Sequence, residues 1–352
     1  MVPFAKARLG LEAGRLGLVM LCMGLGSAVS MPLAGFLSLR RGNRGLLAIS
    51  ASLACCAVPL LALAPTTALL AASLVLFGAA LGVMDVAMNA HAVDVERMSD
   101  RPLMSGFHAL FSIGGLTGAA AVSALLRAGV PLVACSLAVA AALLGLVATQ
   151  WRHLLSIVPD RATARRSMFA APAPITVLIG VLCLVLFLAE GAMLDWGAVF
   201  LHSERGVALE EAGLGYAVFS VAMTIGRLTG DRVTAALGPV RVVRLGSLVA
   251  ATGFILACAL PWSGTTLVGF VLVGIGASNI VPVLFSAAGR IPDTAPGVAI
   301  ATVTTLGYTG LLSGPAVIGA VADGTSLPFA LGCIAVLLVA VCAGASIVRI
   351  RP

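Results

Sequence analysis

Residues 81–97 read LGVMDVAMNAHAVDVER, and this stretch places Asp85 and Asn89 inside an apolar run that is long enough to cross a membrane. A carboxylate in hydrocarbon costs about 3 kcal/mol or more, so it is rarely kept there without a task or a partner. The two polar residues stand four positions apart and therefore share one face of a helix. We expect this face to line a cavity or a seam between helices rather than to contact lipid.

The composition indicates that the whole chain is a membrane protein. Of its 352 residues, 60% are hydrophobic and 10% are charged. The mean hydropathy is +1.12, which lies outside the range of ordinary soluble domains. The chain has room for about eleven spans of roughly 20 residues each, and its 40 glycines suit close contacts between membrane helices. The predicted fold class is therefore an all-α membrane protein.

The charged residues and the cysteines argue against several other classes of protein. The net charge of +7 comes from basic residues that are scattered in short loops without interleaved aromatic residues, which disfavours nucleic-acid binding. The eight cysteines lie in apolar runs without metal-ligand spacing, so we interpret them as small buried hydrophobic residues. No nucleotide-binding loop, HExxH motif or nucleophile–base pair is visible in the sequence. We expect no metal, no cofactor and no enzymatic activity.

Apolar runs without a persistent alternation of period two predict helices rather than strands. The first fifteen residues are too polar for a span, and we expect them to form an extracytoplasmic tail. The long basic connection 150–173 divides the chain into an N-terminal bundle at 16–149 and a C-terminal bundle at 174–352. The eleven expected spans are 16–38, 46–64, 68–92, 104–126, 130–149, 174–201, 212–230, 243–261, 264–289, 297–321 and 326–348.

Arginine residues are distributed unequally between alternating connections. One set of connections holds fifteen arginines, whereas the opposite set holds Arg127 and Arg205 together with the basic residues of the leading tail. By the positive-inside rule the arginine-rich side, which includes the C-terminus, is cytoplasmic. Eleven spans would place the basic leading tail outside the cell with no preceding helix to translocate it, whereas twelve spans would start inside. We therefore expect a further transmembrane helix in front of Met1.

The two bundles carry an internal repeat. Spans 68–92 and 264–289 match at an offset of 194, and spans 104–126 and 297–321 match at an offset of 196. Near-constant offsets indicate a duplicated bundle in the same orientation, as two parallel repeats of six helices would give. The matching residues are Gly78, Gly82 and Asp85 with Leu272, Gly276 and Asn279, and His108, Leu110, Gly114 and Gly118 with Thr304, Leu306, Gly310 and Gly314.

Several segments carry a family resemblance. The loop Gly35–Arg44 and its second copy Gly226–Arg232 resemble the loop motif of the major facilitator superfamily, although Leu39 stands where aspartate is usual in the first copy. Gly307–Pro315 resembles the Gly/Pro motif of helix eleven in that superfamily. The resemblance implies a transporter and says little about its cargo. Segments 85–89, 188–196 and 276–282 resemble a bacterial inner-membrane subgroup, the YbjJ type.

In this superfamily helices 1, 4, 7 and 10 line a central cavity, and the resemblance places polar residues of this chain on three of these helices. Glu190 lies near the middle of its span beside Ala189 and Gly191, which leave it approachable. Because desolvation disfavours the charged form of a carboxyl group, Asp85 or Glu190 can exchange a proton or bind substrate. The alternative is a hydrogen bond between helices that only fixes packing. The candidate substrate or proton-coupling residues are Asp85, Asn89, Glu190, Asn279, Asp195 and His108.

Some polar residues have a simpler interpretation. Asp195 lies about 140° round the helix from Glu190 and precedes Trp196 near the outer end, where an interfacial role is expected. His108 is interpreted mainly as a satisfied polar residue near a helix end, with a proton relay as the alternative. Glu96 is expected in cytoplasmic water at the end of its span, and its spacing to nearby histidines matches no metal site.

Charged residues near the cytoplasmic helix ends are candidates for a gate. Family resemblance favours a latch between helix ends, and plain positive-inside anchoring is the alternative. The candidate gate residues are Arg40, Arg41, Arg227, Asp231 and Arg232. A set of glycines in span 297–321 is spaced by three and four residues, and we expect these glycines to allow close approach of helices. We expect a kink at the proline that follows them. These helix-packing residues are Gly307, Gly310, Gly314 and Pro315.

The residues and the resemblance together predict a monomeric secondary transporter that moves a small organic solute across the bacterial inner membrane by alternating access, coupled to protons. An alternative from another class is a membrane receptor or scaffold that does not transport and uses the loop 150–173 as its interaction surface. A further alternative is a truncated transporter that is inactive because it lacks its first helix.

Overall fold

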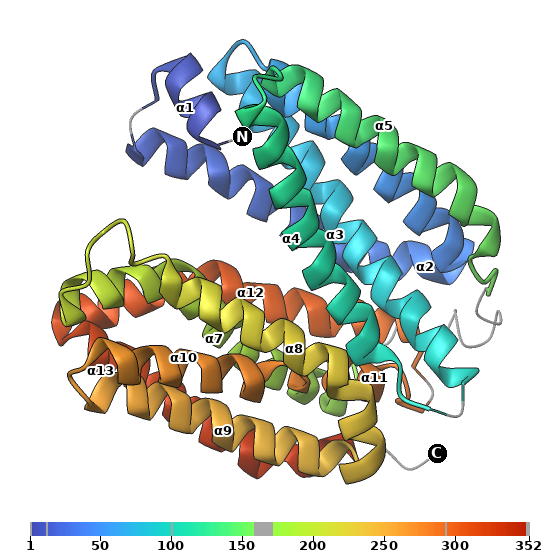
Figure 1. Ribbon diagram of the computed structural model, residues 1–352. Coiled ribbons are helices and arrows are strands. Elements are labelled where there is room, and N and C mark those ends of the chain that lie inside the picture. The colour runs from blue at the N-terminus through green and yellow to red at the C-terminus, as the bar shows by residue number, and fades with distance from the viewer. Residues whose placement is uncertain (1, 12, 100, 158–171, 293, 350–352) are drawn as a thin grey trace. The chain divides into compact units, whose positions relative to one another are not determined.

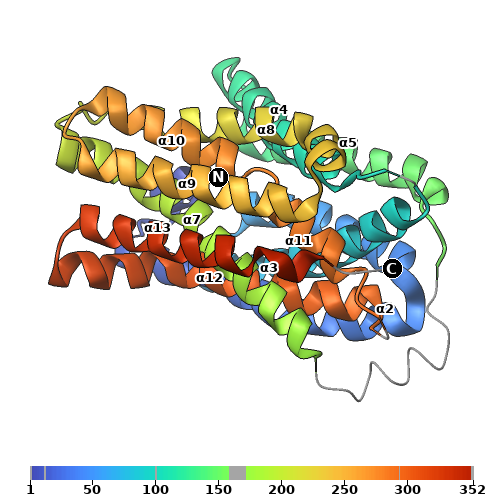
Figure 2. The same ribbon diagram turned by 90° about the horizontal axis from the view of Figure 1, so that it is seen from below.

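Helices make up all the regular secondary structure in the part of the chain that the computed structural model describes, which is residues 2–11, 13–99, 101–157, 172–292 and 294–349 (Figures 1 and 2). This confirms the predicted all-α class. The α-helices are α1 (Val2–Leu9), α2 (Ala13–Leu63), α3 (Thr67–Arg97), α4 (Met104–Arg127), α5 (Leu132–Gln150), α7 (Pro174–Arg205), α8 (Leu214–Leu237), α9 (Pro239–Ala259), α10 (Ser263–Ala277), α11 (Ile280–Ala288), α12 (Pro296–Gly324) and α13 (Leu327–Gly344). Two short 3-10 helices, η1 (Trp151–His153) and η2 (Ala345–Val348), follow α5 and α13.

Ten helical segments of the described part are long and apolar enough to cross a membrane, so the chain is a multi-pass membrane protein. They correspond to ten of the eleven predicted spans. The remaining predicted span, 212–230, is helical over most of its length as part of α8 but falls outside this set. Arg227 and Asp231 contribute to this difference because charged side chains lower the mean hydropathy of α8.

Two predicted spans lie in α2, which is sharply bent at Gly42. This residue has φ 67° and ψ 174°, and the apolar segments on its two sides are Arg15–Arg40 and Gly42–Leu63. Glycine is favoured at a positive φ because a Cβ atom would be strained there. A second interruption separates α10 from α11 at Ser278 and Asn279, within the single span predicted at 264–289.

The chain divides into two compact units, and each is described by itself. The first unit comprises Met1–Asp94, Gly114–Ala171 and Asp293–Thr302. Within it α2 approaches α3 so closely that a Cβ atom on Gly78 would meet the backbone of Met23. The Ser27 hydroxyl donates a hydrogen bond to the Gly78 carbonyl at 2.8 Å. Small residues thus form this helix contact, as is usual in membranes, where the hydrophobic effect does not drive helices together.

Helix α1 lies within the predicted N-terminal tail and packs against the rest of the first unit. Ala5 is buried in a small apolar cluster together with Leu11, Val19 and Leu74. The guanidinium of Arg8 donates to the carbonyl of Ala62 near the end of α2. The sequence predicts a polar tail but not a helix here, because eight residues are too few to show a reliable apolar period.

The second unit comprises Val95–Ile113, Pro172–Pro292 and Val303–Pro352. Helix α9 packs against both α10 and α13, and α9 and α10 run side by side in both ribbon views (Figures 1 and 2). The contact between α9 and α10 is again made by small residues, since a Cβ atom on Gly253 would lie 2.5 Å from the carbonyl oxygen of Gly269. Phe200 and Phe270 are fully buried in the core, with ring centroids 6.3 Å apart.

The compact units depart from the order of the sequence in two short segments. Val95–Ile113, which connects α3 to α4 and includes the first part of α4, belongs to the second unit. Asp293–Thr302, which includes the first turns of α12, belongs to the first. The bundles predicted at 16–149 and 174–352 do not make this exchange, because it depends on contacts that chain order does not indicate.

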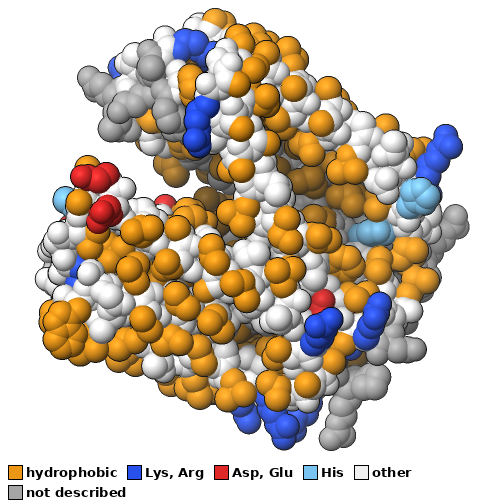
Figure 3. Space-filling view, in the orientation of Figure 1, with side chains coloured by type: hydrophobic (Ala, Val, Ile, Leu, Met, Phe, Trp, Pro, Cys, Tyr) orange, Lys and Arg blue, Asp and Glu red, His pale blue; other side chains and the backbone are white. Residues whose placement is uncertain are grey.

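The surface of the second unit has the pattern of a lipid-facing protein. In Figure 3 hydrophobic side chains cover the outer faces of α8, α9 and α10, and charged side chains gather toward the helix ends. Exposed apolar residues of this kind include Leu245, Leu248 and Ile255 on α9. Contiguous apolar surface on this scale is unfavourable in water and is expected where lipid covers it.

Candidate functional site

An ion pair lies inside the second unit between two membrane helices. Nη2 of Arg227 on α8 is 3.4 Å from Oε1 of Glu190 on α7, and the exposed fractions of the two side chains are 8% and 21%. Small residues flank both positions: Gly191 packs against Leu311, and a Cβ atom on Gly226 would meet the side chain of Ser278. The sequence predicts Glu190 as a coupling residue and Arg227 as a gate residue. The structure brings the two together.

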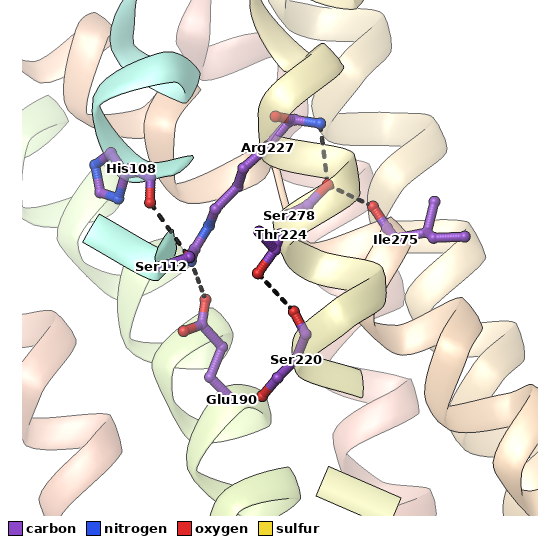
Figure 4. A network of polar contacts seen from close by, with 9 residues as sticks. His108, Ser112, Glu190, Ser220, Thr224, Arg227, Ile275 and Ser278 are labelled. Atoms are coloured by element: carbon purple, nitrogen blue, oxygen red, sulfur yellow. Dashed lines mark hydrogen bonds and ion pairs between the residues drawn. The ribbon is translucent and has the colours of Figure 1, made fainter. Parts of the chain in front are cut away.

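Helix α4 completes this cluster with a hydroxyl group. Nη1 of Arg227 donates to Oγ of Ser112 at 3.0 Å, and that hydroxyl in turn donates to the carbonyl of His108 at 3.2 Å. Figure 4 shows the Ser112 hydroxyl and the Glu190 carboxyl at the same end of the Arg227 side chain. The His108 ring stacks at a tilt against Phe285, with 5.8 Å between centroids. Its buried Nε2 has no hydrogen-bond partner among the described residues.

The two charged groups of this cluster differ in how readily they can lose their charge. A charged pair in a low-dielectric region is stable only when good geometry and further hydrogen bonds offset the loss of hydration. Here a single oxygen of Glu190 meets a single nitrogen of Arg227, and the contact is longer than the ~2.8 Å of strong charge-assisted bonds. Arginine stays charged in proteins, whereas a carboxyl group can take up a proton. The Glu190 side of the pair is therefore the one that can change its charge.

Two carboxylates bind the N-terminal turn of α4. Oε2 of Glu96 accepts from the backbone N–H groups of Leu103 and Met104, both at 2.9 Å. Asp231 on α8 accepts from the next two N–H groups, those of Ser105 and Gly106, at 2.9 and 2.8 Å. The first four N–H groups of a helix have no partner within the helix and carry a partial positive charge, so two acids are a favourable cap.

Glu96 is buried rather than hydrated, contrary to the prediction from sequence. Only 2% of its side chain is exposed, and its second oxygen accepts from Nη2 of Arg290 at 3.2 Å. The two residues are 194 positions apart, which equals one of the two offsets of the internal repeat. Glu96 thus joins the end of α3, the start of α4 and the segment after α11 within the second unit.

Asn279 ties α8 to the interruption between α10 and α11. Its Nδ2 donates to the carbonyl of Gly226 and to Oγ of Ser278, both at 3.0 Å. A Cβ atom on Gly230 would collide with the side chains of Asn279 and Ser105, so a larger residue at this point of α8 would displace them. Asn279 therefore holds in place the helix that carries Arg227.

The other predicted coupling pair lies in the first unit, on α3. Nδ2 of Asn89 donates to the backbone carbonyl of Asp85 at 2.9 Å and to its carboxylate Oδ1 at 3.2 Å. Asp94, near the end of the same helix, accepts a hydrogen bond at 3.3 Å from Nδ2 of Asn43 on α2. Asp85 and Asn89 share one helix face, as their spacing predicted, and each is the other's hydrogen-bond partner.

Several predicted residues lie apart from these clusters. Asp195 is exposed on α7, and Arg232 is exposed on α8. Arg40 is exposed on α2, with its guanidinium 4.8 Å from the ring centroid of Phe36. The side chain of Arg41 lies outside the described residues.

The predicted packing residues of α12 face α7 within the second unit. A Cβ atom on Gly307 would lie 3.0 Å from the ring of Phe187, and one on Gly310 would meet the backbone carbonyl of Leu184. A Cβ atom on Gly314 would lie 3.2 Å from the side chain of Leu188. Pro315 follows within the same helix.

The sequence does not indicate the partners of these groups. Ser112 and Arg290 carry no spacing signal, and nothing local indicates that Glu96 caps the helix that follows it. The described residues contain no group of three histidine, cysteine, aspartate or glutamate side chains that could hold a metal ion.

Asp231→Ala is expected to destabilise the protein by about 1–2 kcal/mol, because two N–H groups of α4 lose a charged cap. The measurement is thermal unfolding of the purified full-length protein in detergent. Arg232→Ala is the matched control on the same helix, since its exposed side chain should change stability by less than about 0.5 kcal/mol. Equal unfolding midpoints for the two variants would contradict a capping role for Asp231.

Comparison with known proteins gives consistent results. The family model described as Major Facilitator Superfamily matches residues 1–203. The chain is 48% identical over 346 residues to an uncharacterized MFS-type transporter of Yersinia pestis, and this alignment covers 98% of this chain and 89% of that protein. It is 33% identical over 330 residues to an uncharacterized transporter of Sinorhizobium fredii, and this alignment covers 93% of this chain and 86% of that protein. A crystal structure of the Escherichia coli fucose:proton symporter FucP matches with a TM-score of 0.78 at 16% identity, over 99% of this chain and 93% of that one, and is similar in fold.

Proposed function

The chain belongs to the Major Facilitator Superfamily and is a transporter rather than an enzyme. We propose that it moves a small organic solute by alternating access and that protons drive this transport. The proposal places it in the bacterial cytoplasmic membrane as a monomer with a cytoplasmic C-terminus. The relatives from Yersinia and Sinorhizobium are bacterial, which supports this location. The fold is also that of a symporter that uses protons, although at 16% identity this likeness does not extend to the mechanism.

The observation that carries the proposal is the Glu190–Arg227 pair. A carboxylate and a guanidinium in membrane helices are costly to keep and usually mark a pathway for ions or substrate. The 3.4 Å contact between them is weak enough to be broken and re-formed. A proton that binds to Glu190 would remove the negative charge and leave Arg227 without its acid.

The consequence of this protonation reaches α4 through a short chain of contacts. Arg227 holds Ser112, and Asp231, one helical turn further along α8, holds the N-terminal turn of α4. A change in the position of Arg227 therefore acts on the same helix that Asp231 and Glu96 cap. In the proposed cycle, release of the Asp231 cap and of the Glu96–Arg290 pair frees the segment Val95–Ile113 from the rest of the second unit, and their formation fixes it there.

The experiment that tests the proposal is solute flux under an imposed pH gradient. A thermal-shift screen of the purified full-length protein first selects a solute that raises the unfolding midpoint. In proteoliposomes, an inward proton gradient is expected to drive accumulation of this solute, and Glu190→Gln is expected to abolish the accumulation. Asp85→Asn tests the second candidate carboxylate in the same way.

Glu204→Gln is the matched control, because Glu204 is an exposed acid near the end of the same helix as Glu190. It should accumulate solute as the wild type does. Flux that ignores the gradient in the wild type would exclude proton coupling, and gradient-driven accumulation in Glu190→Gln would remove Glu190 from the mechanism. Solutes that bind but never cross would favour a receptor over a transporter.

A further inference from the structure

We propose that Arg227 binds a negatively charged group of the cargo, so that the transported solute is a small organic anion, and that Glu190 occupies this position when no cargo is bound. This inference rests on the proposed transport function and adds the chemical class of the solute. It is carried by the hydrogen-bonding capacity of Arg227, the geometry of its contact with Glu190, and the charges around it.

Arg227 has donors that the described residues do not use. An arginine side chain has five N–H groups and cannot relieve an unmet hydrogen bond by losing its proton. Nη1 donates to Ser112 and Nη2 to Glu190, whereas the buried Nε has no hydrogen-bond partner in the described part of the chain. An unpartnered buried donor is unfavourable, so the guanidinium retains capacity for a further acceptor. The residue is more than nine-tenths buried, which marks a built site rather than a surface cation.

Glu190 is a poor permanent partner for this guanidinium. It offers one oxygen to one nitrogen at 3.4 Å, whereas carboxylates and phosphates bind arginine best through two parallel bonds of about 2.8 Å. The Glu190 side chain is also the more accessible of the two, with 21% exposed. A mobile anion that reaches Arg227 can therefore make better contacts than the resident carboxylate makes.

The charges around Arg227 favour an anion over a cation or a neutral solute. The ionisable side chains that interact with it from neighbouring helices are Glu190 on α7 and His108 on α4. Asn279 and Ser278, at the interruption between α10 and α11, bring dipoles but no charge. Glu190 is therefore the one described acid that neutralises Arg227, and its protonation leaves a net positive site.

Proton coupling then follows from simple exchange. When Glu190 takes up a proton, Arg227 loses its internal anion and accepts the carboxylate or phosphate of the cargo. When Glu190 releases the proton on the other side, its carboxylate competes again for Arg227 and displaces the cargo. One proton and one negative charge cross together, so the movement of charge is balanced.

Acetate is the probe that tests this inference, because it is a small organic carboxylate and its use needs no knowledge of the cargo. Thermal unfolding of full-length protein in detergent is followed at constant ionic strength, with acetamide and ethylammonium as neutral and cationic probes of similar size. In Glu190→Gln, acetate is expected to raise the unfolding midpoint by several degrees with a saturable dependence. The rise should be smaller in the wild type and absent in the double variant Glu190→Gln/Arg227→Gln.

A second measurement covers the case in which Glu190→Gln does not accumulate in the membrane. The wild type is titrated with acetate at neutral and at mildly acid pH, where acetate is still ionised. The stabilisation is expected to grow as Glu190 becomes protonated and to vanish in Arg227→Gln. The inference would be overturned if acetate did not stabilise the protein, or if it still did so in Arg227→Gln. It would also be overturned if acetamide or ethylammonium stabilised the protein equally.

These results are separable from those of the flux experiment. Gradient-driven uptake of a neutral or cationic solute, with no acetate effect, would overturn the anionic cargo and leave proton-driven transport in place. Acetate binding at Arg227 without any flux would support the anion site and overturn transport.

Discussion

Replacement of Glu190 by glutamine is expected to lower the free energy of unfolding by about 3 kcal/mol, because it leaves a buried guanidinium without its acid. The cost arises from Arg227, which stays charged, keeps its hydrogen bond to Ser112 and meets only a neutral amide at position 190. Arg227→Gln should cost less, since the Glu190 that remains can become neutral by binding a proton. Thermal or denaturant unfolding of the purified variants in detergent measures both effects.

The double variant Glu190→Gln/Arg227→Gln decides whether the pair itself is responsible. Removal of both charges leaves no unpaired ion, so the double variant should be more stable than Glu190→Gln alone, with a coupling between the two sites of about 1–3 kcal/mol. Strict additivity of the two single effects would mean that the 3.4 Å contact contributes nothing to stability, and the structural basis for a charge-sensitive site would be lost.

Gly310→Val is expected to destabilise the protein by about 1–3 kcal/mol through overpacking. A Cβ atom at this position would meet the backbone carbonyl of Leu184, and a backbone atom cannot move aside as a flexible side chain can. Helix α12 would have to separate from α7, the helix that carries Glu190. The unfolding midpoint should fall, and solute flux should fall with it.

Gly332→Val on α13 is the matched control for this substitution. No atom lies within 4 Å of a Cβ atom built at Gly332, so the variant carries the same change in helix propensity without the collision. A midpoint for Gly310→Val that equals that of Gly332→Val would show that α12 and α7 do not need their close approach at this point.

The sequence predicted the helical spans well because each one is a local property. A run of about 20 apolar residues must be helical in a bilayer to satisfy its backbone hydrogen bonds. Ten of the eleven predicted spans meet the criteria of length and hydropathy in the structure. The span in α8 falls short of them, and it is also the helix that carries Arg227 and Asp231.

The sequence predicted individual residues of the candidate site but not which of them contact one another. The cost of a buried charge marked Glu190 and Asp85 from the sequence alone, and the loop motif marked Arg227 and Asp231. Their partners stayed hidden because side chains from different helices have no fixed spacing in the chain. Ser112, for instance, is 115 positions from Arg227, to which it is hydrogen bonded.

By itself the sequence determined the membrane environment, the helical class, the repeat and the resemblance to the family to which the chain belongs, because composition and short periods record burial and local backbone needs. Tertiary structure alone decided that Glu190 meets Arg227, that Glu96 and Asp231 share the start of α4, and that Val95–Ile113 joins the second unit. The physical reason is that these contacts form between helices, where the distance between two groups depends on packing rather than on their separation along the chain.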